Sequence, residues 1–253
     1  MTKEEFLTFR SEGFTFAEIG EHFNLTERQV NYRTKKWGLD YSKKKSLNED
    51  FFSSNTKACN YWAGFLAADG WIEGDRSRVG LALQAQDIGH LEKFKKAVGS
   101  SHDICPFMKD TAYRIRFNSE TMVQDLNKIF NITPAKTHTY KIPYFTENYL
   151  LLEFLRGYIE GDGHYHQTST KRVDLGLCSA NIDFLLGFKE ICEILLDRAI
   201  SQVPVLNINP KGQVFNIRFN LDDSAEILNL LYANSTEATR LDRKFNTASL
   251  VLR

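Results

Sequence analysis

The chain lacks several features that would assign it to large classes of protein. Its 253 residues include only five prolines and four cysteines, and the cysteines form neither a CxxC pair nor a spacing that suits zinc. No apolar run reaches membrane-spanning length, and the charged start MTKEEF does not resemble a signal peptide. Glycine-rich phosphate loops are absent, which argues against nucleotide hydrolysis. We therefore expect a cytoplasmic protein with reduced thiols, from a bacterial or phage-infected cell or an organelle.

An excess of charge of either sign is also missing. The 32 Lys and Arg residues equal the 32 Asp and Glu residues, and a net charge of zero argues mildly against a nucleic-acid partner. The distribution is less even, because residues 28–45 contain seven basic residues and only one acid, Asp40. The hydrophobic content of 42% and the charged content of 25% are ordinary for a globular protein of one to three domains.

The basic segment closes a module predicted for residues 1–45. The pattern predicts helices over residues 2–11, 16–23 and 27–37, with Asn24 in the second turn and Thr26 as the last N-cap. This arrangement resembles the helix-turn-helix superfamily. The third helix and the lysines after it would then supply donors for bases or phosphates: Arg28, Gln29, Arg33, Lys35, Lys36, Lys43 and Lys44. A packing domain with a solvated basic face is the alternative, and residues 46–57 are predicted as a polar linker.

A duplicated segment is the most informative feature that is present. Residues 62–70 read WAGFLAADG and residues 155–163 read LRGYIEGDG, so each is an apolar helix with small residues on one face that ends in Asp-Gly. One such ending is explained by a turn, but two at matching positions are not. Because backbones approach closely where side chains are small, pairing of the two helices would bring Asp69 and Asp162 together.

The residues that follow each segment repeat as well. RVGLALQAQD from Arg78 aligns with RVDLGLCSAN from Arg172 at an offset of 94, and YRIRFNSE from Tyr113 aligns with FNIRFNLD from Phe215 at an offset of 102. Each copy, 58–142 and 143–253, reads as helix, two strands, helix, two strands, helix. We predict an α+β fold: a tandem αββαββα pseudo-dimer with saddle-shaped antiparallel sheets, next to a small all-α N-terminal domain.

Alternation along the predicted strands gives each sheet one packed face and one wet face. Ile115 points to the core, Arg116 and Asn118 point outward, and Arg218 and Asn220 are their expected counterparts. Such side chains can read bases in a major groove. The outward residues predicted to contact DNA are Arg78, Gln84, Arg114, Arg116, Asn118, Arg172, Asn216, Arg218 and Asn220. For any one of them, an ordinary solvated sheet surface is the alternative.

The two duplicated segments resemble the paired LAGLIDADG motifs of single-chain homing endonucleases, and the resemblance covers roughly residues 58–253. It implies Mg²⁺-dependent hydrolysis of both strands of a long, asymmetric DNA site, with two or three ions bound and Mn²⁺ able to substitute. It assigns the metal site to Asp69 and Asp162 with the residues before them, Ala68 and Gly161. The first motif departs from the family at Ala67, where an acid is frequent.

The resemblance also implies a catalytic basic residue near each metal. Lys136 is the match in the first repeat, and Arg240 or Lys244 is the match in the second. His164 and His166 lie close to Asp162, where a histidine metal site is a weaker alternative than DNA contact.

Two other functions on this fold stay open, a non-cleaving transcriptional regulator and an RNA maturase. The retained aspartates favour the enzyme. The expected partner is double-stranded DNA, bound by a monomer without a membrane or a small-molecule cofactor.

Overall fold

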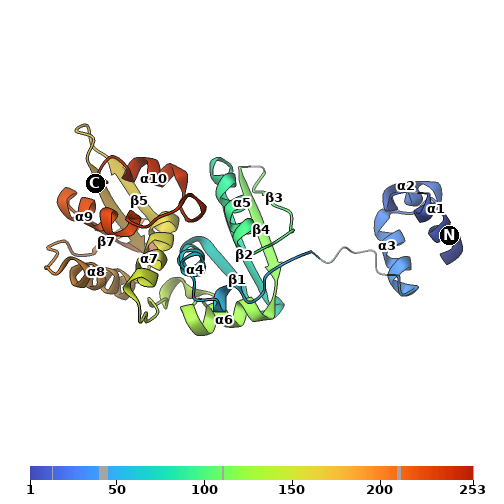
Figure 1. The fold of residues 1–253 in the computed structure, drawn as a ribbon, viewed down its shortest axis with the longest axis horizontal. Helices are drawn as coiled ribbons and strands as arrows, with labels where there is room; N and C mark the ends of the chain where they lie inside the picture. The colour runs from blue at the N-terminus through green and yellow to red at the C-terminus, as the bar shows by residue number, and fades with distance from the viewer. Residues whose placement is uncertain (13, 40–44, 110, 210–211, 253) are drawn as a thin grey trace. The chain divides into compact units, whose positions relative to one another are not determined.

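The computed structural model describes residues 1–12, 14–39, 45–109, 111–209 and 212–252. The chain divides into two units, Met1–Lys45 and Ser46–Arg253 (Figure 1). Each unit has an apolar core of its own. Lys43 and Lys44, predicted to bind DNA, lie outside the described residues. None of the helices in the described part of the chain combines the length and apolarity that crossing a lipid bilayer requires.

The smaller unit consists of three short helices, α1 (Lys3–Ser11), α2 (Phe16–His22) and α3 (Glu27–Lys36). A threonine in a capping box begins each helix, which satisfies backbone N–H groups that a helix start leaves unpaired. Asn24 adopts the left-handed conformation between α2 and α3, with φ of 53°. Phe6, Ile19 and Val30 are fully buried and form the centre of this unit.

The larger unit contains two copies of one arrangement. The first copy comprises η1 (Phe51–Ser53), α4 (Lys57–Asp69), β1 (Gly70–Glu73), β2 (Arg78–Gln84), α5 (Ile88–Ala97), β3 (Cys105–Phe107), β4 (Ala112–Asn118) and α6 (Glu120–Phe130). The second comprises α7 (Asn148–Asp162), β5 (Gly163–Gln167), β6 (Val173–Ser179), α8 (Ile182–Leu196), β7 (Val205–Asn209), β8 (Gly212–Arg218) and α9 (Leu221–Tyr232). The 3₁₀ segment η4 (Lys136–His138) precedes α7, and η5 (Glu237–Thr239) and α10 (Asp242–Ala248) follow α9.

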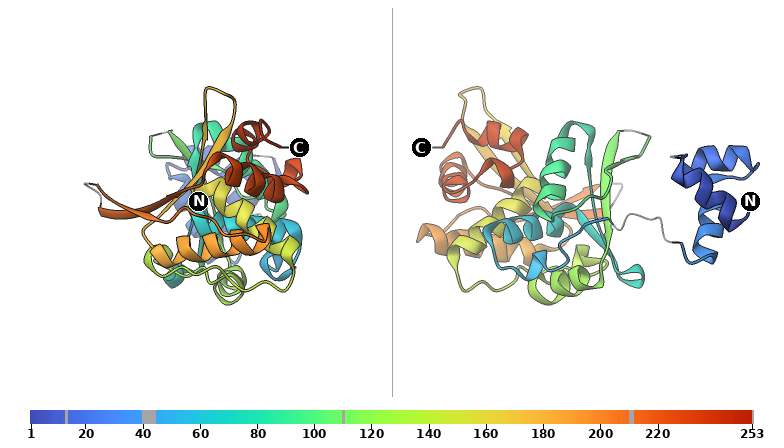
Figure 2. Two further views of the ribbon diagram at one scale, coloured as in Figure 1. Left: turned by 90° about the vertical axis from the view of Figure 1, so that its left-hand side faces the viewer. Right: turned by 45° about the vertical axis from the view of Figure 1, so that its right-hand side comes forward.

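Each copy forms one antiparallel sheet of four strands. The strand orders are β1-β2-β4-β3 and β5-β6-β8-β7, which correspond position by position. Val79, Leu81, Ile115 and Phe117 are buried beneath the first sheet, as the alternation predicts. The β7–β8 hairpin projects beyond the rest of the second sheet (Figure 2). The predicted α+β fold with two tandem αββαββα units is confirmed.

The two sheets match at a different register from the one that sequence alignment indicates. Gly80 pairs with Trp71 across the first hairpin, and Gly176 pairs with His164 across the second, which sets the offset between β2 and β6 at 96 rather than 94. The second hairpin has a longer strand β5 and a longer turn. The structural counterpart of Arg78 is therefore Asp174, not Arg172. Because the error is two residues, every side chain keeps its predicted face.

The predicted linker, residues 46–57, packs as part of the larger unit. Phe51 and Phe52 are buried in its core, and the Asn48 N–H donates to the Val98 carbonyl. The mostly polar residues 46–50, which precede the two phenylalanines, led to the prediction of a linker. The boundary at residue 45 coincides with the division into units.

Candidate active site

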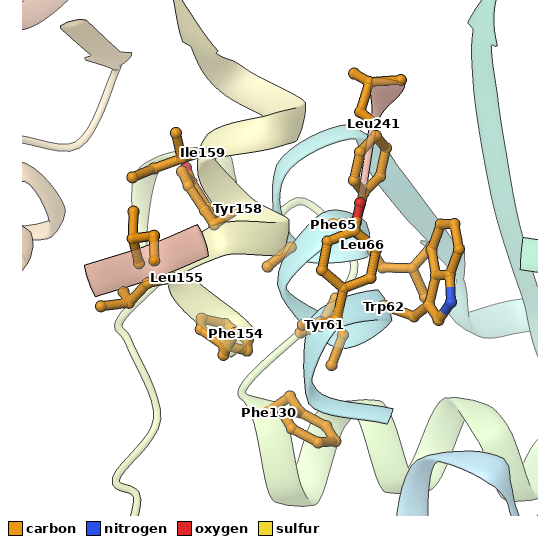
Figure 3. Close-up of a cluster of buried hydrophobic side chains, with 14 of the residues drawn as sticks. Tyr61, Trp62, Phe65, Leu66, Phe130, Phe154, Leu155, Tyr158, Ile159 and Leu241 are labelled. Carbon is orange, nitrogen blue, oxygen red and sulfur yellow. The ribbon is translucent and has the colours of Figure 1, made fainter. Parts of the chain in front are cut away.

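The centre of the larger unit is the crossing of α4 and α7, where the two backbones touch. A methyl group at Gly64 would overlap the carbonyl oxygen of Phe154, and one at Gly157 would overlap the carbonyl oxygen of Tyr61. These two contacts exchange under the offset of 93 that relates the duplicated segments, so they obey a pseudo-twofold relation. Large apolar side chains of both helices flank the crossing (Figure 3).

The same relation brings the two aspartates together. A methyl group at Gly161 would collide with Cβ of Ala68 and would lie 3.4 Å from Oδ2 of Asp69. Ala68 and Gly161 thus face each other near the pseudo-twofold axis, and the carboxylates follow directly on either side. Both helices end at a glycine in extended conformation, Gly70 or Gly163, which turns the chain straight into the first strand of each sheet.

The two carboxylates repel each other and lack part of their hydration. Although both side chains reach solvent, the surrounding protein and the neighbouring Asp162 raise the pKa of Asp69 to about 6. Burial also raises the pKa of Asp162, against the lowering effects of a hydrogen bond from Tyr158 and of two lysines. The pair therefore has more negative charge than its surroundings neutralise.

One lysine stands at the end of each helix, in equivalent positions. Nζ of Lys136 donates to the carbonyl of Gly70 at 2.7 Å, and Nζ of Lys244 donates to the carbonyl of Gly163, 93 residues further on. Lys244 also donates to the carbonyls of Ile159 and Gly161, at 3.0 Å and 2.9 Å. Burial lowers the pKa of both ammonium groups, that of Lys244 to about 8.

Arg240, the other residue predicted as the counterpart of Lys136, lies elsewhere. Its guanidinium stacks 3.8 Å from the ring centroid of Phe245, and its Nε lies 3.9 Å from Asp242. Between the two predicted alternatives, the geometry therefore favours Lys244. The spacing of ATRLDRKF could not separate them, because both residues belong to one short segment whose path is set by packing.

The aspartate pair fits a divalent cation of the Mg²⁺ type. Its donors are carboxylate oxygens at two helix C-termini, where the helix dipole favours a cation, and a cation would relieve the repulsion that raises the pKa of Asp69. Within the described residues, no three His, Cys, Asp or Glu side chains cluster so as to hold a metal ion, which leaves His164 and His166 without a histidine site. His166 instead contacts Asp174, at 3.2 Å.

The outward face of the first sheet carries the predicted basic and amide side chains. Arg116 is exposed at the centre of β4. Arg78 donates to Glu73 and to Asn118, and Arg114 lies over the ring of Phe107. Gln84 is exposed at the end of β2. All five predicted residues reach this face, but the charge of Arg78 is neutralised by Glu73.

The second sheet differs from the prediction at several positions. Arg218 is exposed but paired with Asp174 at 2.6 Å. Arg172 lies in the turn before β6 and pairs with Asp222. Asn220 lies beyond β8 and caps α9, where its side chain accepts from the backbones of Asp222 and Asp223, whereas Asn118 is the last residue of β4. Asn216 is half-buried on β8. The sequence analysis missed Asp174, because an alignment offset of 94 matched Arg78 with Arg172 instead of with Asp174.

The predicted DNA-binding residues of α3 are only partly available. Arg28, Lys35 and Lys36 are exposed. Oε1 of Gln29 accepts from Thr26 in the capping box, and Arg33 donates to the carbonyl of Met1 at 3.3 Å.

Among comparisons with known proteins, solved structures match the fold of the chain. No family model and no curated protein matches the sequence. Among solved structures, a double mutant of I-SmaMI aligns with a TM-score of 0.50 and 9% identity, over 76% of this chain and 90% of that one. I-SmaMI is described as a meganuclease and a LAGLIDADG homing endonuclease. The larger unit has the LAGLIDADG fold.

Two further solved structures align with the chain at lower TM-scores. I-DmoI in complex with DNA and Ca aligns with a TM-score of 0.49 and 15% identity, over 80% of this chain and 98% of that one. Full-length DUF199/WhiA from Thermatoga maritima aligns with a TM-score of 0.45 and 17% identity, over 81% of this chain and 63% of that one. Identities this low establish shared architecture, so the function has to be argued from the site.

Proposed function

We propose that the protein is a site-specific DNA endonuclease that uses a divalent metal ion to cut both strands of a long, asymmetric target. The observation that carries this proposal is the pair of aspartates at the crossing of α4 and α7, each with a lysine at the adjacent helix end. Two equivalent half-sites suit a reaction that breaks two phosphodiester bonds of opposite strands.

The aspartates would hold the metal, with Mg²⁺ as the expected ion. When bound, such an ion activates water and stabilises negative charge on a phosphate. Lys136 and Lys244 lower the pKa of Asp69, so they favour the ionised carboxylate that a cation requires. As fixed cations at this site, the lysines also suit stabilisation of a phosphate during cleavage. The close backbone contact at Gly64 and Gly157 keeps the two half-sites at a constant separation.

The difference between the two sheets supports an asymmetric target. Where the first sheet has Glu73 beside Arg78, the second has His166 beside Asp174. The cationic Arg78 of the first sheet is thus replaced by the anionic Asp174 in the second, and the two halves would prefer different base sequences. The exposed basic residues of α3 would add further phosphate contacts.

The test is cleavage of DNA by the purified full chain in Mg²⁺. The substrate is circular DNA that carries the sequence flanking the gene's insertion site, or a library of random inserts from which cut molecules are recovered. Linear product is expected from the wild type, and Asp69→Asn or Asp162→Asn should reduce its rate by about 100-fold or more. Asp197→Asn is the matched control, because Asp197 has left-handed backbone, which Asn tolerates, and lies outside the site.

A non-cleaving DNA-binding regulator is the second candidate, since the exposed basic residues of α3 and of the first sheet would serve it as well as a nuclease. Glu73, Asp174 and Asp222 each pair with an arginine, which reduces the positive charge available to DNA in either case. Tight, sequence-selective binding with no nicking in Mg²⁺, Mn²⁺ or Ca²⁺ would overturn the endonuclease proposal and support the regulator.

A further inference from the structure

The C-terminal segment of the chain reaches back to the aspartate pair. Residues 236–248, which we call the C-terminal arm, include η5 and α10 and carry Lys244. Lys244 is almost fully buried, and its three carbonyl partners all belong to the end of α7. This lysine thus depends on a segment that follows the whole second repeat, whereas Lys136 follows α6 directly.

A buried ionic group on α7 holds the arm. Glu160 is 1% exposed and accepts from the Leu241 N–H of the arm at 2.8 Å, from the Tyr232 hydroxyl at 2.6 Å and from the Tyr61 hydroxyl. Arg156, also 1% exposed, donates to the carbonyl and hydroxyl of Thr239 at 3.0 Å and 3.1 Å. Arg156 and Glu160 lie four residues apart, so one face of α7 presents both to the arm.

The hydrogen-bond directions show why a carboxylate suits this place. The single hydroxyl proton of Tyr61 is donated to Glu160, so the Tyr61 oxygen accepts from Nε2 of His90 at 2.9 Å. His90 is neutral, since burial lowers its pKa to about 3. Every neighbour of the Glu160 oxygens is therefore a donor. Burial raises the pKa of Glu160, and the hydrogen bonds from these donors together with nearby Arg156 act against that rise.

The first repeat has no such device. At the offset of 93, Arg156 corresponds to Ala63 and Glu160 to Ala67, and both alanines are buried in apolar surroundings. Figure 3 shows Leu241 of the arm in the same cluster as Tyr61 and Phe65 of α4. The arm is also tied to the first repeat by Lys93–Asp242 at 2.8 Å and Arg243–Asp87 at 2.9 Å.

From these contacts we propose that Arg156 and Glu160 are positioning residues, which hold the C-terminal arm in place so that Lys244 stays at the second helix end. The inference deepens the proposed function and rests on it, since it assigns the arm to one of two half-sites. Loosening the arm should impair the half-site of Lys244 and leave that of Lys136 intact.

Two independent variants test the inference, so that the test does not depend on the folding of either one. Glu160→Gln removes the charge and points an amide N–H₂ at groups that donate. The double variant Glu153→Leu with Arg156→Met replaces a buried ion pair by apolar groups, an exchange that is often neutral for stability, and removes both bonds to Thr239. Ser224→Ala is the control, because it deletes a buried hydrogen bond, to Leu175 N–H, that does not involve the arm.

The first readout needs no activity. The full chain, without metal or DNA, is treated with acetic anhydride, and acylation of Lys244 relative to Lys136 is measured by mass spectrometry. We expect a rise of about tenfold in both test variants, as local opening exposes Lys244, and no change in Ser224→Ala. Unchanged protection of Lys244 in both test variants would overturn the inference.

The second readout resolves the two DNA strands. One strand should be cut about tenfold more slowly in the test variants while the other keeps its rate, so that nicked circles accumulate. Equal slowing of both strands would contradict a positioning role, because general destabilisation affects both half-sites. If the wild type cuts no DNA while the acylation result holds, the endonuclease proposal fails and the anchoring of the arm stands.

Discussion

At the scale of single residues, the site combines charges that oppose the stability of the fold. Asp69 and Asp162 crowd each other, and each lysine donates to the carbonyl at a helix end, where burial lowers the pKa of its ammonium group. Perturbed groups of this kind gather at functional sites, because function requires them where packing does not. Their cost to the fold is itself measurable.

Asp69→Asn is expected to stabilise the protein when metal is absent. The amide carries no charge, so the repulsion from Asp162 and the loss of hydration both disappear. Solvent screening at a partly exposed carboxylate limits the gain to the order of 1 kcal/mol. Thermal unfolding in EDTA measures this effect, and Mg²⁺ should raise the midpoint of the wild type but not of the variant. A lower midpoint for the variant in EDTA would show that the two carboxylates do not repel.

Single residues also show which features an alignment of the two repeats can identify and which it cannot. Arg116 and Arg218 were identifiable as outward residues, because period-two alternation survives any shift of two positions. Asn220 was not identifiable as a helix cap, since whether a residue ends a strand or begins a helix depends on where pairing stops. Asp174 was hidden because alignment at an offset of 94 matched Arg78 with Arg172, whereas the lengths of the hairpins set the offset at 96.

At the scale of elements, the crossing of α4 and α7 supplies the rigidity of the site. Small residues let the backbones meet, and two duplicated helices can then form one close interface. The motifs indicated this pairing from sequence, because Gly64 and Gly157 stand at the same place in each segment.

Gly157→Ala tests the crossing against a matched helical glycine. A methyl group at Gly157 meets the backbone of Tyr61, which cannot move aside without separating the helices. We expect a loss of roughly 3 kcal/mol in the free energy of unfolding, at the upper end for overpacked cores. Gly187→Ala on α8 meets nothing within 4 Å, so it should gain about 0.5–1 kcal/mol through helix propensity. Urea unfolding of the two variants decides, and equal effects would exclude a tight crossing.

The anchoring of the C-terminal arm is an element-scale feature that sequence did not reveal. Arg156 and Glu160 are charged residues within an otherwise apolar helix. From sequence alone, Arg156 is as compatible with an exposed side chain as with a buried one. Only the docking of residues 236–248 against α7 shows that both are enclosed.

At the scale of the whole molecule, two units with separate cores share one chain. The smaller unit closes over Phe6, Ile19 and Val30, and the larger one includes Phe51 and Phe52. Each unit therefore has an apolar centre made of its own residues.

Deletion of residues 1–45 is expected to weaken DNA binding and leave residual cleavage. This segment includes the exposed Arg28, Lys35 and Lys36, so its loss should reduce the slope of log K against log salt by about 1 for each phosphate contact removed. Binding measured by fluorescence anisotropy between 50 and 200 mM salt, roughly the range in which such slopes are resolved, provides the comparison. An unchanged slope would exclude the smaller unit from DNA binding, and loss of Mg²⁺-induced stabilisation would show that the units are not independent.

By itself the sequence determined the fold class, the two αββαββα copies and the convergence of Asp69 with Asp162. Periodicity specifies the helices and strands of each copy, and two duplicated helices with small residues on one face bury those faces by packing together. Tertiary structure alone decided that Lys244 rather than Arg240 stands at the second helix end, that Asp174 opposes Arg218, and that the C-terminal arm docks on Arg156 and Glu160. Those outcomes depend on hairpin length and on the path of a segment some 80 residues away from α7 in the chain, and both are set by packing free energy that no local pattern records.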